Sequence, residues 1–155
     1  MSDCFISYTS PDEAFAKGVH DLLRQAGLTV FLASISLQPG DLWSTKIQAA
    51  VDQSDWIILL ASRRACASPY VQQEIGRALA GSKKLIPVIW DIDPAELPGW
   101  VSQYQALDIR GNTGEQVAAR IGEIAVRIKQ DKRQAAIIAG SLITVFLIIA
   151  ASSKG

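Results

Sequence analysis

Short apolar runs alternate with stretches of helical periodicity along the first 130 residues of the chain. The runs cover residues 4–7, 29–32, 56–60, 85–90 and 106–109. Between them, apolar side chains recur every three or four residues, as at Phe15, Val19 and Leu22 in the first stretch. Regular alternation of strands and helices predicts an α/β domain built on a five-stranded parallel sheet.

Capping signals mark two of the predicted helices. Ser10 and Glu13 have the S-x-x-E spacing of a capping box ahead of the first apolar stripe. Thr113 and Gln116 repeat this logic ahead of a later amphipathic stretch. Because no Pro interrupts the chain after that point, we expect one continuous helix over residues 114–151.

Residues 135–151 form the most apolar segment of the chain, with no charged residue and no Pro. A membrane-spanning helix needs about 20 mostly apolar residues, with a lower limit of roughly 17. The segment therefore predicts one C-terminal transmembrane helix. A buried core helix or an amphipathic tail is the alternative, but a helix that is apolar on every face needs a larger core around it.

Basic residues flank this apolar segment unequally. Three precede it and one follows it: Lys129, Lys132, Arg133 and Lys154. Because excess positive charge stays on the cytoplasmic side of a membrane, the pattern predicts a single-pass membrane protein whose N-terminal domain is cytoplasmic. Residues 1–130 are then the folded domain, and residues 131–155 are an anchor in contact with membrane lipid.

Small residues recur every four positions in the predicted anchor, at Ala136, Gly140 and Thr144. Such a face lets transmembrane helices approach one another closely, which favours self-association. Small residues are also common in transmembrane helices in general, so the sequence leaves both interpretations open.

Composition limits the classes of function. The chain has 15 basic and 15 acidic residues, a formal net charge of zero, and no basic block typical of nucleic-acid binding. We interpret the two cysteines, Cys4 and Cys66, as reduced core residues, and with His20 as the single histidine we predict no metal site. G-x-G-x-x-G, P-loop, H-E-x-x-H and G-x-S-x-G motifs are absent, which disfavours the corresponding dehydrogenases, triphosphatases and hydrolases.

An open parallel sheet binds its ligands beyond the carboxyl ends of its strands. In this chain, those ends fall at residues 8–10, 33–36, 61–64 and 90–93. We therefore expect a functional site in the loops that follow the strands.

Four motifs occur in an order and at a spacing that match a known family. They are FISYTS at residues 5–10, PGDLW at 39–43, WIILLAS at 56–62 and SPYVQQEI at 68–75. Through these motifs, residues 3–128 resemble a Toll/interleukin-1 receptor (TIR) domain of the prokaryotic type. The resemblance implies a flavodoxin-like, five-stranded parallel sheet in the order 2-1-3-4-5 with flanking helices.

The resemblance also implies a catalytic residue. Enzymatic TIR domains cleave NAD⁺ at its nicotinamide glycosidic bond with a Glu on the third helix, commonly the last residue of a Trp-x-x-x-Glu pattern. Glu74 holds that position here, with Tyr70 in place of the Trp and on the same helix face. A surface acid paired with Arg77 is the structural alternative. NAD⁺ is the implied substrate, and no further cofactor is expected.

Further residues are predicted to contact the substrate at strand ends, beside the long loop, or next to Glu74. They are Ser7, Tyr8, Asp41, Trp43, Arg63 and Tyr70. Trp43 can equally be a core residue. Residues 33–35 offer no basic or aromatic side chain, which leaves the pyrophosphate of NAD⁺ to Arg63, Arg64 or backbone amides.

Three functions are consistent with the resemblance. The first is a membrane-anchored NAD⁺ glycohydrolase that acts after self-assembly in antiphage or other immune defence, its copies joined by TIR–TIR contacts and the transmembrane helix. The second is a non-enzymatic adaptor that works through TIR–TIR interaction alone. The third is a synthase of a cyclic ADP-ribose-type messenger, which only its product distinguishes from the hydrolase.

Overall fold

The computed structural model describes the backbone of residues 1–34 and 45–152. Outside the description lie residues 35–44 and 153–155 and the side chains of residues 34, 45–47, 70, 74, 77, 142 and 144–152. Two predicted substrate contacts, Asp41 and Trp43, therefore lie outside the described residues.

Five parallel strands form the centre of the fold, in the order β2-β1-β3-β4-β5. Their bounds are Ser2–Tyr8 (β1), Val30–Ser34 (β2), Ser54–Leu60 (β3), Lys84–Ile89 (β4) and Leu107–Asp108 (β5). In the register of the sheet, Ser7 of β1 pairs with Ala33 of β2 and with Leu59 of β3. The strand order confirms the predicted flavodoxin-like sheet, and each predicted strand overlaps an observed one.

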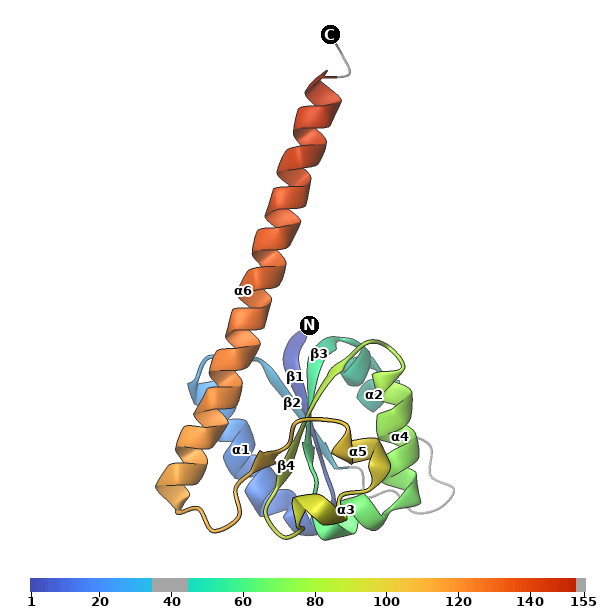
Figure 1. The fold of residues 1–155 in the computed structure, drawn as a ribbon, viewed down its shortest axis with the longest axis vertical. Coiled ribbons are helices and arrows are strands. Elements are labelled where there is room, and N and C mark those ends of the chain that lie inside the picture. Colours follow the sequence, from blue (N-terminus) through green and yellow to red (C-terminus); the bar gives the residue numbers. More distant parts are fainter. Residues whose placement is uncertain (35–44, 153–155) are drawn as a thin grey trace.

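Helices cover both faces of the sheet (Figure 1). They are α1 (Glu13–Gln25), α2 (Thr45–Asp52), α3 (Arg63–Ala67), α4 (Pro69–Leu79), α5 (Gly99–Ser102) and α6 (Gly114–Ser152), with 3₁₀ turns η1 (Ser10–Asp12) and η2 (Pro94–Glu96). The α1 helix and the first half of α6 pack on one face, whereas α2 and α4 pack on the other. Because both faces are covered, the central strands are continuous apolar runs.

Alternate residues of the central strands build two separate cores. In β1, Ile6 and Tyr8 point into the core under α1 and α6, while Phe5 points into the core under α2 and α4. The β3 strand follows the same rule, with Ile58 in the first core and Ile57 in the second. Within each strand, even-numbered and odd-numbered residues therefore lie on opposite faces of the sheet.

One predicted capping box forms, and the start of the first helix differs from the prediction. The backbone N–H of Thr113 donates to Gln116 Oε1 at 2.8 Å, and the N–H of Gln116 donates to Thr113 Oγ1 at 3.3 Å. Near the N-terminus, the η1 turn precedes α1, so the α-helix begins only at Glu13. The carboxylate of Glu13 pairs with Lys17 at 2.8 Å.

The α6 helix packs on the sheet through its first half and extends beyond the domain through its second (Figure 1). The packed half carries one buried stripe: Ile121, Ile124, Ala125 and Ile128. Further along, the described apolar side chains Ile137, Ile138 and Ile143 are exposed. The predicted domain boundary at residue 130 falls inside this helix.

The predicted membrane localisation is wrong. Among the residues that the structure describes, no helix combines the length and apolar character that crossing a membrane requires. This finding overturns the single-pass anchor, its predicted orientation and the contacts with membrane lipid.

Candidate functional site

The carboxyl edge of the sheet carries the candidate site. In the order 2-1-3-4-5, the chain reverses its direction across the sheet between β1 and β3, and such switch points leave a crevice beyond the strand ends. A pocket of about 460 Å³ opens at this edge. Its lining residues follow β1, β3 and β4: Pro11, Asp12, Ser62, Arg63, Arg64, Ala67 and Asp91.

Asp12 ties the loop after β1 to the loop after β3. Its Oδ2 accepts hydrogen bonds from the Thr9 hydroxyl at 2.6 Å and from the Ser62 hydroxyl at 2.8 Å. Ser62 is also the N-cap of α3, because its Oγ accepts from the backbone N–H of Ala65 at 3.2 Å. These bonds fix one wall of the pocket at the switch point.

Arg63 and Arg64 are neighbours with different partners. The Arg63 guanidinium donates to Glu96 Oε2 at 2.8 Å, and its backbone N–H donates to Asp91 Oδ1 at 2.8 Å. The hydrogen bond from Arg63 holds the pKa of Glu96 below its ordinary value. Arg64 is exposed, and among the described residues its guanidinium has no hydrogen bond or ion pair. The uncommitted cation of the pocket is therefore Arg64, not Arg63.

Ser7 and Tyr8, both predicted substrate contacts, lie on opposite faces of the sheet. Tyr8 is 7% exposed and packs in the core under α1 and α6, where burial raises the pKa of its phenol. Ser7 is fully buried on the other face, and its Oγ has no hydrogen-bond partner among the described residues. The structure thus separates the two neighbours, and only Ser7 lies on the face that α4 covers.

Tyr70 and Glu74 lie on α4, which follows the short helix α3 at the carboxyl edge. Ser68 caps α4, since its Oγ accepts from the backbone N–H of Val71 at 3.3 Å. Val71 and Ile75 fix the helix on the sheet, each 1% exposed. The backbone of α4 is thus held at the site, while the side chains of Tyr70 and Glu74 lie outside the described residues.

Arg110 pairs with two carboxylates at the other end of the carboxyl edge, beyond β4 and β5. Its guanidinium donates to Asp108 Oδ2 at 2.8 Å and to Asp93 Oδ2 at 2.8 Å. The bond from Arg110 lowers the pKa of Asp108, and the Ala95 N–H together with Arg110 lowers the pKa of Asp93. These groups already satisfy one another, so we place the site nearer to β1 and β3.

The thiols are poor candidates for chemistry at neutral pH. Burial raises the pKa of Cys4 to about 12 and that of Cys66 to about 11, so neither is a thiolate near neutral pH. Within the described part of the chain, no three or more His, Cys, Asp or Glu side chains are grouped so that they could hold a metal ion.

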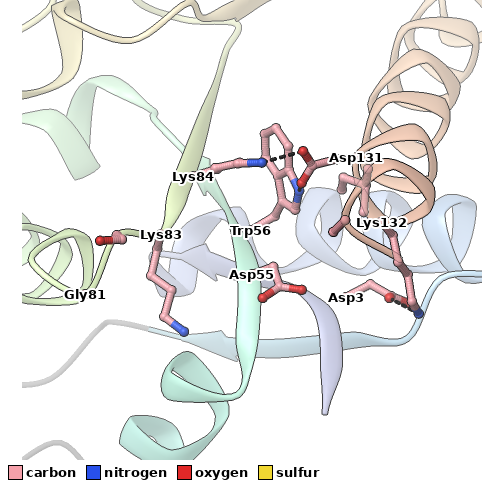
Figure 2. Close-up of a pocket in the computed structure, with 11 residues that line it drawn as sticks. Asp3, Asp55, Trp56, Gly81, Lys83, Lys84, Asp131 and Lys132 are labelled. Carbon is pink, nitrogen blue, oxygen red and sulfur yellow. Dashed lines mark hydrogen bonds and ion pairs between the residues drawn. The ribbon is translucent and has the colours of Figure 1, made fainter. Parts of the chain in front are cut away.

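A second pocket, of about 310 Å³, lies at the opposite, amino edge of the sheet where α6 leaves the domain (Figure 2). Asp131 of α6 accepts hydrogen bonds from Lys84 and from Trp56 Nε1, the latter at 3.2 Å. Lys132 donates to Asp3 Oδ1 at 2.7 Å. Because these groups pair with one another across the pocket, we interpret it as a joint between α6 and the sheet.

Sequence reasoning named none of three polar residues of the carboxyl-edge pocket, Asp12, Ser62 and Asp91, although Ser62 and Asp91 lie within the strand ends at which it expected the site. Each is a polar residue shortly after the end of a buried strand. That position was itself a usable signal, because carboxyl ends of neighbouring parallel strands converge at one edge.

Comparison with known proteins adds a family and two relatives. A family model described as "TIR domain" matches residues 4–125. NAD(+) hydrolase ApTIR of Actinoplanes sp. is 36% identical over 132 residues, which cover 74% of this chain and 18% of that protein. The protein named Probable 2' cyclic ADP-D-ribose synthase BdTIR, of Brachypodium distachyon, is 31% identical over 97 residues, covering 61% of this chain and 43% of that protein. The chain thus spans less than half the length of each relative.

Solved structures resemble the fold. The TIR domain of the Toll-related receptor TRR-2 of Hydra magnipapillata has a TM-score of 0.64 at 20% identity, covering 83% of this chain and 99% of that one. The RPS4 and RRS1 TIR domain heterodimer gives a TM-score of 0.63 at 11% identity, covering 82% of this chain and 95% of that one. At these identities the likeness concerns the fold alone.

Proposed function

Because this chain belongs to the TIR-domain family, we propose that it is an enzyme that cleaves NAD⁺ between nicotinamide and ribose. The observation that carries the proposal is 36% identity, across 74% of this chain, to a protein named NAD(+) hydrolase. A second relative is named as a probable 2' cyclic ADP-D-ribose synthase, so a cyclised ADP-ribose is the alternative product.

Glu74 is the proposed catalytic residue. The reaction breaks the bond between ribose C1′ and the nicotinamide nitrogen, and the bonding electron pair goes to that nitrogen. Nicotinamide leaves as a neutral molecule because the pyridinium carried the positive charge, so the general acid of ordinary glycosidases is not needed. A carboxylate on α4 would stabilise the positive charge that develops on the ribose.

The group that attacks C1′ decides the product. Attack by water gives ADP-ribose and releases one proton, which is hydrolysis. Attack by a hydroxyl group of the same ADP-ribose gives a cyclised product and also releases one proton. A single proposed site therefore accounts for both relatives' names.

The structure supports some of the predicted substrate contacts better than others. Tyr8 is committed to a core and the Arg63 guanidinium to Glu96, so we propose Arg64 as the cation for the pyrophosphate. Ser7 is fully buried on the face that α4 covers, which favours a role beside the helix of Glu74 over a direct contact with the substrate. Asp41, Trp43 and Tyr70 stay as predictions for the long loop and for α4.

We further propose that the enzyme acts as an assembly of TIR domains and that loss of NAD⁺ serves immune or antiphage defence. The heterodimer of the RPS4 and RRS1 TIR domains supports the first part, because this chain has the same fold. Assembly through these contacts would concentrate the enzyme and complete its sites.

NAD⁺ consumption by the full chain at high protein concentration, with chromatography of the products, tests the proposal. We expect wild-type protein to consume NAD⁺ and Glu74→Gln to lose activity by at least about 100-fold, with an unchanged melting temperature. The product separates hydrolase from cyclase.

A non-enzymatic adaptor is the second candidate, favoured by the known pairing of TIR domains in the heterodimer. If concentrated, assembled protein left NAD⁺ intact while still binding other TIR domains, the adaptor would replace the enzyme as the proposed function. An adaptor would also tolerate Glu74→Gln in its binding assay.

A further inference from the structure

One fully buried hydroxyl group in the sheet has no hydrogen-bond partner. Ser7, in the interior strand β1, is 0% exposed, and its Oγ is unpaired among the described residues. Ser54, in the neighbouring strand β3, is equally buried, but its Oγ bonds with the Ser2 hydroxyl at 2.6 Å and donates to the Ala50 carbonyl at 2.7 Å. Since buried polar groups are nearly always paired, the Ser7 hydroxyl requires an explanation.

Ser7 lies on the side of the sheet that α4 covers. Side chains alternate along a strand, so Ser7 shares its face with Phe5 and not with Tyr8. Phe5 belongs to the core that includes Val71 and Ile75 of α4. The unpaired hydroxyl therefore faces the layer that contains the helix of the proposed catalytic carboxylate.

Small side chains flank Ser7 on this face towards β2 and towards the carboxyl edge, although its β3 partner Leu59 is large and fully buried. Ala33 of β2 pairs with Ser7, and Ala61 follows Leu59, the β3 partner of Ser7, by two positions. Phe5 and its large neighbours fill the same face further from the edge. The face is therefore shallower over Ala33 and Ala61, where a side chain from the covering layer can approach the strand beside Ser7.

Backbone geometry places Ser7 and position 74 at a similar depth below the carboxyl edge. The α4 helix runs back from that edge towards the start of β4 (Figure 1), and position 74 lies five residues after Pro69, about 7.5 Å along the helix axis. Ser7 pairs with Leu59, three residues before Ser62, which is about 10 Å along the strand.

We propose that Ser7 is a positioning residue: in the substrate complex, its hydroxyl donates a hydrogen bond to the carboxylate of Glu74. The inference rests on the proposed function, because it gives the proposed catalytic group its partner. A donor to a carboxylate stabilises the ionised form and fixes its direction. The ionised group then faces the positive charge that develops at ribose C1′ as nicotinamide leaves. Catalytic hydrogen bonds commonly close only when substrate binds, which accounts for the unpaired state without substrate.

Ser7→Ala and Ser54→Ala form a matched pair, since each removes one fully buried hydroxyl from neighbouring strands. For Ser7→Ala, we expect kcat for NAD⁺ cleavage to fall roughly 10- to 100-fold and KM to stay within about twofold. Its Tm should equal or exceed that of wild type, because no hydrogen bond of the unliganded protein is lost. Ser54→Ala should show the reverse, a lower Tm and an unchanged kcat.

The pH dependence of kcat supplies a readout that a purely structural role would not move. Loss of the donor raises the pKa of the Glu74 carboxyl, so the acid limb of the kcat profile should shift to higher pH by roughly one unit in Ser7→Ala. Ser7→Thr keeps a hydroxyl and should restore the acid limb.

Three outcomes for Ser7→Ala would overturn the inference. They are an unchanged kcat and acid limb, a fall in Tm like that of Ser54→Ala, and a raised KM at unchanged kcat, which would assign the hydroxyl to the substrate. If wild-type protein leaves NAD⁺ intact, the proposed function fails separately. Carbon-13 NMR titration of Glu74 with ADP-ribose bound then still tests the bond, because equal pKa values in wild type and Ser7→Ala would contradict it.

Discussion

At the amino edge of the sheet, the polar groups that join α6 to the strands are paired: Asp3 with Lys132, and Asp131 with both Lys84 and Trp56 (Figure 2). At the carboxyl edge, the Ser7 hydroxyl and the Arg64 guanidinium have no partner within the described part of the chain. On the same sheet, the groups that join α6 to the amino edge are therefore paired, whereas two groups at the carboxyl edge are not.

This difference separates a structural role from a functional one on physical grounds. Paired polar groups stabilise the native state and have little left to offer a ligand. A buried unpaired group such as the Ser7 hydroxyl reduces stability until a ligand or a rearranged side chain supplies the missing partner, whereas an exposed one such as the Arg64 guanidinium stays solvated and available to a ligand. The comparison thus points to the carboxyl edge as the functional one, independently of any motif.

Removal of Asp3 should give the largest effect on stability. Asp3 is 8% exposed, and its Oδ2 accepts from the backbone N–H and the hydroxyl of Thr29, each at 2.7 Å, in addition to the bond from Lys132. We expect Asp3→Ala to lower the free energy of unfolding by about 3 kcal/mol in urea denaturation, because it leaves a backbone donor and a cation unpaired. Asp55→Ala, an exposed residue of the same pocket, should change it by less than about 0.5 kcal/mol. A loss of NAD⁺ cleavage by folded Asp3→Ala would contradict the assignment of a purely structural role to the amino edge.

Arg64→Ala should weaken substrate binding at the carboxyl edge. We expect KM for NAD⁺ to rise roughly three- to tenfold, because an exposed cation bound to a pyrophosphate contributes about 1 kcal/mol. Arg63→Ala is the matched control, since its guanidinium is already paired with Glu96. Titration calorimetry of ADP-ribose with each variant measures the difference without turnover. Equal effects of the two substitutions would contradict the assignment of Arg64.

Asp131→Asn should lower the free energy of unfolding less than Asp3→Ala does. The amide keeps an acceptor for Trp56 Nε1 but loses the charge that pairs with Lys84. Because this pair is partly exposed, we expect the free energy of unfolding to fall by about 1 kcal/mol. A double-mutant cycle with Lys84→Met should recover a coupling energy of about 0.5 kcal/mol. Zero coupling would mean that the ion pair does not contribute to the joint.

Lowering the pH should gradually reduce the stability that the carboxylates of the amino edge contribute. Burial raises the pKa of Asp3, but hydrogen bonds from Lys132 and Thr29 outweigh burial and hold this pKa below its ordinary value, and the bond from Lys84 lowers the pKa of Asp131. A carboxyl group with a lowered folded pKa contributes stability above its unfolded pKa and loses it as pH falls through the folded value. The free energy of unfolding should therefore decline below about pH 4. Asp131→Asn should flatten that decline, and identical pH profiles would contradict this account.

The sequence predicted those parts of the fold that depend on local patterns. Strands covered on both faces are apolar runs, and the Thr113–Gln116 capping box forms within a single turn. The start of α1 differed: residues 10–12 form a 3₁₀ turn, and the Asp12 carboxylate in it bonds with Ser62, 50 residues further along the chain. The strand order came from the TIR resemblance and not from the periodicity.

The site was predictable only in part, for the same reason. Arg63 and Arg64 look alike in the sequence, and Glu96, 33 residues beyond Arg63, decides which one is committed. The alternation of side chains along β1 could have predicted that Ser7 and Tyr8 lie on opposite faces of the sheet. The membrane prediction was wrong: among the described residues, no helix is long and apolar enough to cross a membrane. Glu74, Tyr70, Asp41 and Trp43 stay predictions.

The bond between Asp3 and Lys132 joins residues that are 129 positions apart. During synthesis, β1 leaves the ribosome before the other strands of the sheet, yet it occupies an interior position and needs β2 and β3 beside it. The contacts of Asp131 and Lys132 can close only after nearly the whole domain has been made. A nascent chain interrupted before residue 131 lacks the contacts of both Asp131 and Lys132. The contacts between α6 and the sheet therefore form last, and in an incomplete polypeptide their partners at the amino edge stay unpaired.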